Sequence, residues 1–253
     1  MTTQKKFEER TKTYLGLSIV SIVLAGVSVN FFIVGSLGII PFADYRDKLL
    51  IPSIIALAAI AIYSHYKIRP LSNRLLTGLW IGAIATLALE AIRIPSYMIF
   101  QWLPGDDMIM MPGAFLAGLA PSPMALMDMM QSGAMTSMSQ SMIITVMVLG
   151  GFYHFWNGAT LGAVYTVFVG RGKWYYGLVW GFIIHIGMML APWLIMMFDP
   201  FGLKYNGGFT IFTVSLLAHL AYGAVLGILA SRFVKDNNGS IFSILRKKLP
   251  NVK

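Results

Sequence analysis

The stretch "HFWNGATLG" (residues 154–162) lies inside a long apolar run, and "HLAYGAVLG" (residues 219–227) repeats its frame. The two share H-x-x-x-G-A-x-L-G, which is five identities in nine positions. Residues four apart lie on nearly the same face of a helix. Each stretch therefore places one histidine and two glycines in a single stripe, and the shared frame predicts two related helices.

The chain around these stretches is strongly apolar. Of its 253 residues, 57% are hydrophobic and 11% are charged, and its mean hydropathy is +0.71. Soluble domains carry about a quarter charged residues, and the apolar blocks here approach the roughly 20 residues that a membrane helix needs. Strand-like alternation is absent. The composition predicts an all-α polytopic protein, a single integral domain (residues 1–253) in contact with the lipid bilayer.

Six spans are the simplest interpretation of the apolar blocks. They cover residues 14–38, 49–66, 75–99, 142–169, 175–198 and 208–231. An even number of spans places residues 1–13 and the basic tail 234–253 on the same side.

The basic residues are distributed very unevenly between the two sides. One side holds Lys5, Lys6, Arg10, Lys12, Lys67, Arg69, Arg74, Arg171, Lys173, Arg232, Lys235, Arg246, Lys247, Lys248 and Lys253, and the other holds only Arg46, Lys48 and Lys204. The excess predicts that both termini are cytoplasmic. The net charge of +9 thus reflects membrane topology and does not indicate a nucleic-acid partner.

Spans three to six each carry a stripe of small residues that also includes a histidine or a glutamate. The stripes are Gly78, Gly82, Thr86 and Glu90; Gly150, His154, Gly158 and Gly162; Gly177, Gly181, His185 and Met189; and Ser215, His219, Gly223 and Gly227. Small residues at such spacing let helix backbones approach closely. The pattern predicts two related hairpins, spans three–four and five–six, which form a glycine-packed four-helix bundle.

The titratable side chains in these stripes are candidate site residues, because charged groups at membrane depth are costly and usually functional. Three imidazoles and one carboxylate suit zinc, iron or copper. The predicted ligands are Glu90, His154, His185 and His219. Arg93 is expected to orient Glu90, and Asn157 and Tyr222, each three residues after a histidine, are expected to support the ligands.

Other interpretations of the same residues stay open. His154 and His219, each followed by glycine four residues later, fit the two axial ligands of one b-type haem, which leaves Glu90 unexplained. Histidine and glutamate also relay protons in transporters, so a small transporter or a proton or ion pathway is an alternative. In the simplest case each histidine only donates one hydrogen bond in the core. The protein would then be a structural subunit, packed as a homo-oligomer or against other membrane subunits.

The predicted extracytoplasmic loop, residues 103–141, is rich in methionine. Ten of the 17 methionines fall between Met108 and Met142. Thioethers select Cu(I), so the loop suggests an outer copper relay formed by Met108, Met110, Met111, Met127, Met129 and Met130. Methionine is also a flexible apolar filler, and a partly re-entrant loop would use it in that way.

The stretch "GLWIGAIATLALEAIRIP" (residues 78–95) and the two histidine frames resemble patterns in small YagU-like prokaryotic inner-membrane proteins. The resemblance implies a prokaryotic plasma membrane and carries no catalytic residue, because that group has no settled activity. The sequence contains no Walker A, GxSxG, HExxH or dinucleotide motif. It contains no cysteine, and hence no disulfide or thiolate ligand. Whether the protein is an enzyme is left open by these patterns.

Overall fold

The computed structural model describes residues 3–103, 107–133, 137–192, 194–195, 199–202, 210–235 and 240–241. Within these ranges every regular element is helical, which confirms the all-α prediction. The elements are α1 (Thr3–Ser36), α2 (Phe42–Tyr45), the π-helix η1 (Arg46–Leu50), α3 (Ile51–Lys67), α4 (Arg69–Met98), α5 (Asp107–Leu116), α6 (Pro123–Gln131), α7 (Gln140–Val169), α8 (Tyr175–Met189) and α11 (Thr210–Phe233).

Five described segments are long and apolar enough to cross a membrane. They are Thr11–Ser36, Phe42–Lys67, α4, α7 and α11. Large apolar side chains such as Val23, Ile55 and Val148 point outward on them, as expected for contact with lipid. The chain is therefore a polytopic membrane protein.

Helix α8 is shorter than the sequence predicts. Its 15 residues reach about 22 Å at roughly 1.5 Å per residue, less than the roughly 30 Å of a bilayer core. The helix ends at Met189, residues 192, 194 and 195 are helical again, and the predicted boundary at 198 lies outside the described residues. Pro192 accounts for the break, because a proline disfavours helical geometry at the residue before it.

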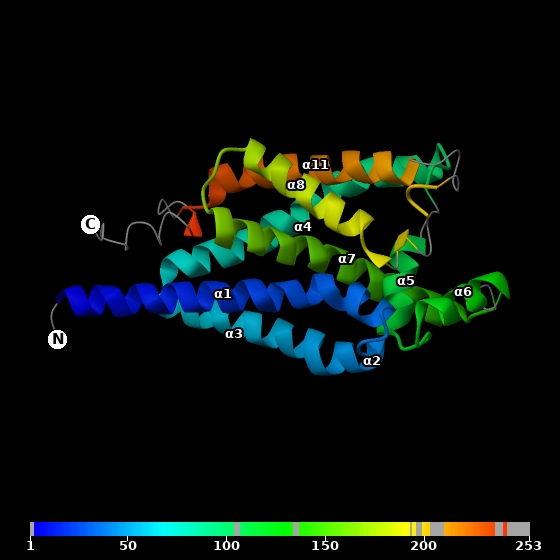
Figure 1. Cartoon of the computed structure of the whole chain (residues 1–253), viewed down its shortest axis with the longest axis horizontal. Helices are drawn as coiled ribbons and strands as arrows, with labels where there is room; N and C mark the ends of the chain where they lie inside the picture. Colours follow the sequence, from blue (N-terminus) through cyan, green and yellow to red (C-terminus); the bar gives the residue numbers. More distant parts are fainter. Residues whose placement is uncertain are drawn as a thin grey trace.

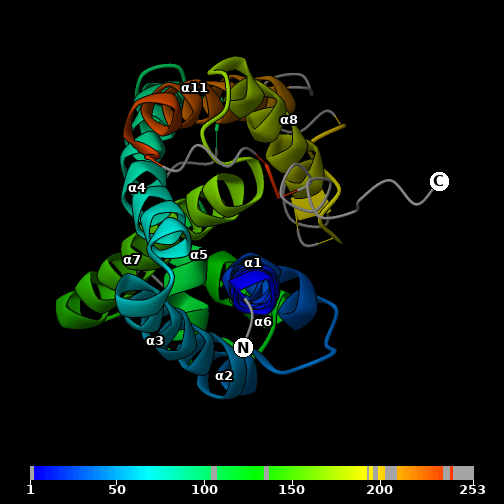
Figure 2. The same cartoon turned by 90° about the vertical axis from the view of Figure 1, so that its left-hand side faces the viewer.

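The long helices lie side by side along one axis, with the start of α1 at one end and α5 and α6 at the other (Figure 1). Helix α7 packs against α4, α1 and α5, whereas α11 packs against α8 and α4. The end view shows α1 and α3 on one side of α7, and α4, α11 and α8 on the other (Figure 2). Helices α4, α7, α8 and α11 form the predicted four-helix bundle.

Glycines bring the helices of each hairpin into backbone contact. Gly78 and Gly82 of α4 face Gly158 and Gly162 of α7, and Gly177 and Gly181 of α8 face the corresponding glycines of α11. A Cβ atom placed on any of these four α4 and α8 glycines would lie within 3.0 Å of a backbone atom of the partner helix, closer than real Cβ atoms come. The predicted glycine packing is confirmed in both hairpins.

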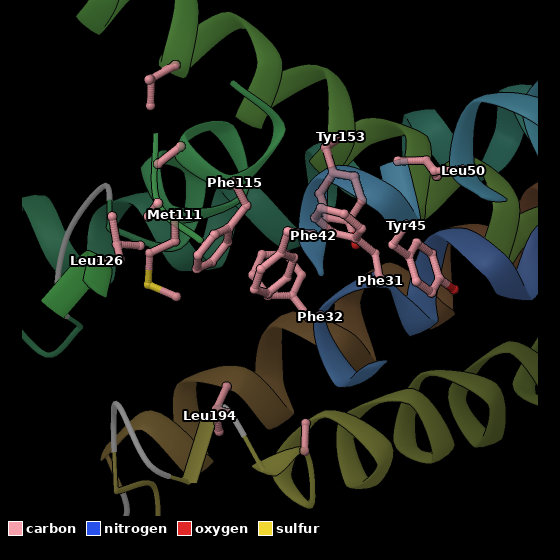
Figure 3. Close-up of a cluster of buried hydrophobic side chains, with 14 of the residues drawn as sticks. Phe31, Phe32, Phe42, Tyr45, Leu50, Met111, Phe115, Leu126, Tyr153 and Leu194 are labelled. Atoms are coloured by element: carbon pink, nitrogen blue, oxygen red, sulfur yellow. The ribbon is translucent and has the colours of Figure 1, made fainter. Parts of the chain in front are cut away.

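A buried aromatic cluster fixes the α2 and α5 segments to the bundle (Figure 3). Phe42 and Phe115 stack with ring centroids 4.0 Å apart, which joins α2 to α5. Phe31 and Phe32 of α1 pack on Phe42, and Tyr153 of α7 packs on Phe32. Aromatic contacts of this kind stabilise the core beyond their buried area. The α5 part of the Met-rich segment is thus a packed cap on the bundle.

Helix α5 also approaches α7 through glycine. A Cβ atom on Gly113 would overlap the carbonyl of Val146, and one on Gly150 would overlap the carbonyl of Ile109. Gly150 belongs to the stripe that carries His154. The stripe of α7 therefore packs on α4 with one part and on the cap with the other.

Candidate functional site

Glu90 and Arg93 form a buried ion pair on α4. Nε of Arg93 donates to both carboxylate oxygens of Glu90 at 3.0 Å, and Nη2 donates to Oε2 at 2.6 Å. The two residues are only 7% and 6% exposed. Such charge-assisted bonds are about twice as strong as neutral ones. The pair keeps both charges inside the bundle without a net charge.

His154 of α7 adds an imidazole to this pair. Its Nε2 lies 2.6 Å from Oε1 of Glu90. The contact is an ion pair when the imidazole is protonated, and Nε2 makes no aligned hydrogen bond with a described residue. Nη1 of Arg93 is likewise buried and has no hydrogen-bond partner among the described residues. The cluster therefore holds a cationic donor that no described residue satisfies.

A second polar cluster links α8 to α11 through Ser215. Nδ1 of His185 and Nδ1 of His219 each lie 3.2 Å from Oγ of Ser215. Nδ1 of His219 also lies 2.7 Å from the carbonyl oxygen of Ser215. His185 is fully buried, and its ring centroid is 6.0 Å from that of His219. This cluster is a hydrogen-bonded chain of two imidazoles and one hydroxyl.

A cavity of about 150 Å³ lies between the two clusters. Its polar lining comprises Arg93, His154, Asn157, Ser215 and His219. Its apolar lining comes from α1, α4, α5, α7, α8, α11 and Leu103, which follows α4. A cavity of this volume accepts a molecule about as large as benzene. The cavity is therefore a mostly apolar space with a few polar groups, as small-molecule sites are.

The structure brings the predicted site residues together as two pairs. Glu90 contacts His154, and His185 is linked to His219. No group of three or more His, Cys, Asp or Glu side chains is placed to hold a metal ion among the residues that the structure describes. The four-ligand metal site stays a prediction.

Of the supporting residues, Arg93 holds Glu90 as the spacing predicts. Asn157 lines the cavity and accepts a hydrogen bond from the hydroxyl of Ser28 on α1. Tyr222 instead donates to the carbonyl oxygen of Gly158 at 2.7 Å. Its phenol joins the two hairpins rather than contacting a histidine.

Most methionines of the predicted copper relay pack in the core near the cap. Met110, Met127 and Met129 are partly buried against the aromatic cluster, as apolar fillers would be. Met111 is 2% exposed and is the relay residue that lines the cavity in the described part of the chain. The side chains of Met108 and Met130 lie outside the described residues.

Sequence analysis missed Ser215 and Ser28 as parts of the site. Ser215 stands four residues before His219, where the α7 stripe has Gly150, and this departure from the repeat was the available signal. Ser28 lies in α1, where Ser18 and Ser21 are also buried. Serines are common packing residues in membrane helices, so those positions alone do not mark a site.

These features define an all-α polytopic membrane protein with a buried ion cluster beside an internal cavity. No family model, curated protein or solved structure matches the chain. The resemblance to YagU-like proteins stays a prediction.

Proposed function

We propose that this membrane protein binds a small, mainly apolar molecule in its internal cavity and that Arg93 recognises a hydrogen-bond acceptor on that molecule. The observation that carries the proposal is Nη1 of Arg93. The residue lines the cavity, and this donor is buried without a partner in the described structure. Leaving a buried donor unsatisfied costs about 1–3 kcal/mol, and more when the group is charged. A bound acceptor would remove that cost.

The glycine contacts favour a binding site over an open pore. The cavity lies toward the α5 end of α4 and α7, whereas Gly78, Gly82, Gly158 and Gly162 bring these helices into contact toward the other end. A water path through the bundle would require these backbones to separate. The transporter and proton-pathway hypotheses stay predictions, with this cavity as the site at which cargo would bind.

The direction of the stripes favours an internal site over a packing surface for other subunits. The glycines of each hairpin face each other within one chain, and Glu90, His185 and His219 are buried inside it. A purely structural subunit would instead present its small-residue stripes outward. Association with copies of itself or with other membrane subunits stays a prediction.

Binding is tested by saturation-transfer NMR with butyramide, a small apolar molecule that carries a carbonyl acceptor. We expect saturable binding to the wild-type protein in detergent micelles. Val214→Phe places a ring in the cavity and should abolish it, because Val214 is a buried lining residue. Leu217→Phe, on the same helix but 52% exposed, is the matched control and should bind normally.

A second variant tests the role of Arg93. Arg93→Lys keeps the positive charge but removes the guanidinium fork, and we expect an affinity at least about tenfold lower, given the ~1.5–3 kcal/mol of a hydrogen bond to a charged group. Equal butyramide binding by the wild-type and Val214→Phe proteins would show that the signal comes from the micelle, and the proposal would be wrong.

Copper is a second candidate ligand, supported by a separate observation. Met111 and Met188 line the same cavity as His154 and His219. Two thioethers and two imidazoles are a donor set that suits Cu(I). Measuring the metal content and the absorption spectrum of the purified protein tests this hypothesis, together with those of zinc, iron and one b-type haem. Stoichiometric copper that is lost in Met188→Leu would support the copper site.

A further inference from the structure

A hydrogen-bond acceptor also faces the cavity, from His219. Nδ1 of this histidine lies 2.7 Å from the carbonyl oxygen of Ser215. A carbonyl only accepts hydrogen bonds, so this contact assigns the proton to Nδ1. In the neutral ring Nε2 then carries the lone pair, and no described residue donates to it. The cavity lining thus includes a spare donor on Arg93 and a spare acceptor on His219, besides the unbonded Nε2 of His154.

With His154 in its neutral form, the charges around the cavity are balanced. Glu90 is neutralised by Arg93, and His154 lies against the same carboxylate. On the other side, His185 and His219 are linked through the neutral hydroxyl of Ser215. A ligand that entered as an anion would add an uncompensated charge inside the membrane, which is costly. The site therefore favours a ligand with no net charge that offers both an acceptor and a donor.

We infer that the ligand is a short apolar carboxylic acid that binds together with its proton. The inference rests on the proposed function and names its ligand class. The carbonyl oxygen of the acid accepts from Nη1 of Arg93, and its O–H donates to Nε2 of His219. Its hydrocarbon part occupies the apolar side of the cavity against Leu89, Ile211 and Val214. The cavity of about 150 Å³ limits that part to roughly the size of benzene.

The test compares butyric acid with butyramide in the same NMR titration at pH 5, 6, 7 and 8. A simple carboxyl group has a pKa of about 4.3, so the protonated fraction falls about tenfold per pH unit above pH 6. We expect the apparent affinity for total butyrate to fall by the same factor. Butyramide binding should stay constant, and it serves as the control for effects of pH on the protein itself.

Variants of His219 test the acceptor that receives the ligand's proton. His219→Phe should weaken butyric acid at pH 5 by tenfold or more, and butyramide as well, because an amide N–H can also donate to Nε2. His219→Gln keeps an acceptor oxygen and should restore most of the acid binding, even if His219→Phe folds poorly. Leu217→Phe is again the control, because its side chain faces outward.

The outcomes distinguish the two proposals. If butyramide binds but butyrate binds no tighter at pH 5 than at pH 8, the ligand is not an acid and only this inference fails. Tighter butyrate binding at pH 8 would indicate an anion site and would also overturn it. If neither molecule binds to the wild-type protein, both this inference and the proposed function fail.

Discussion

At the scale of single residues, Glu90 compensates the charge of Arg93 inside the bundle. Its two carboxylate oxygens accept three donated bonds from Arg93, and one of them also contacts the imidazole of His154. The carboxylate thereby connects α4 to α7. Because the pair is buried, removing one partner leaves an uncompensated charge in the bundle, whereas removing both leaves none.

Glu90→Leu should destabilise the protein by about 3–5 kcal/mol, because it leaves the guanidinium of Arg93 buried and unpaired. The double variant Glu90→Leu/Arg93→Met removes both charges and should recover most of that loss. The measurement is equilibrium unfolding in detergent micelles, followed by circular dichroism. A double variant as unstable as Glu90→Leu would show that the loss comes from packing instead of charge.

The sequence predicts part of this site and not the rest, for a geometric reason. The spacing of Glu90 and Arg93 by three residues on one helix is sufficient to predict their contact. The rise per residue along the predicted spans also places His154, His185 and His219 at similar depth. Which histidine meets which partner depends on how far each helix is rotated about its axis. That rotation is set by tertiary packing, such as the contact of Tyr222 with Gly158.

At the scale of elements, the molecule uses one glycine arrangement twice. Gly158 and Gly162 follow His154 on α7, and Gly223 and Gly227 follow His219 on α11. Each set packs against two glycines of the other helix of its hairpin. The sequence predicts the repeat because its residues recur with the period of a helix face. The sequence does not predict the end of α8 at Met189, because the apolar run continues past Pro192.

The repeat predicts that equivalent glycines respond alike to substitution. A Cβ atom on Gly162 or on Gly227 would overlap backbone atoms of the partner helix, so Gly162→Ala and Gly227→Ala should each destabilise the protein by about 1–3 kcal/mol. Gly151 and Gly187 have open space around them, so Gly151→Ala and Gly187→Ala are matched controls on α7 and α8.

Thermal unfolding of the four variants in the same detergent is the measurement. The controls should be neutral or slightly stabilising, because alanine is favoured over glycine within helices by up to about 1 kcal/mol. If Gly227→Ala is tolerated while Gly162→Ala is not, the second hairpin does not depend on the close contact that its geometry shows.

At the scale of the whole molecule, the described basic residues gather at one end. Lys67, Arg69, Lys173 and Arg232 lie at helix ends or in connections that sit with the start of α1, whereas Arg46 and Lys48 lie near the cap (Figure 1). Basic connections stay in the cytoplasm during insertion. We therefore predict that the cap faces outward and that the connection between α7 and α8 faces inward.

Because the chain contains no cysteine, single thiols can report this orientation without background. Ser132→Cys, after α6, should react with a membrane-impermeant maleimide in intact prokaryotic cells, since Ser132 is exposed near the cap. Lys173→Cys, exposed between α7 and α8, should react only after permeabilisation. The opposite pattern would place the cap and its nearby cavity on the cytoplasmic side, so a carboxylic acid would reach the site from within the cell rather than from outside.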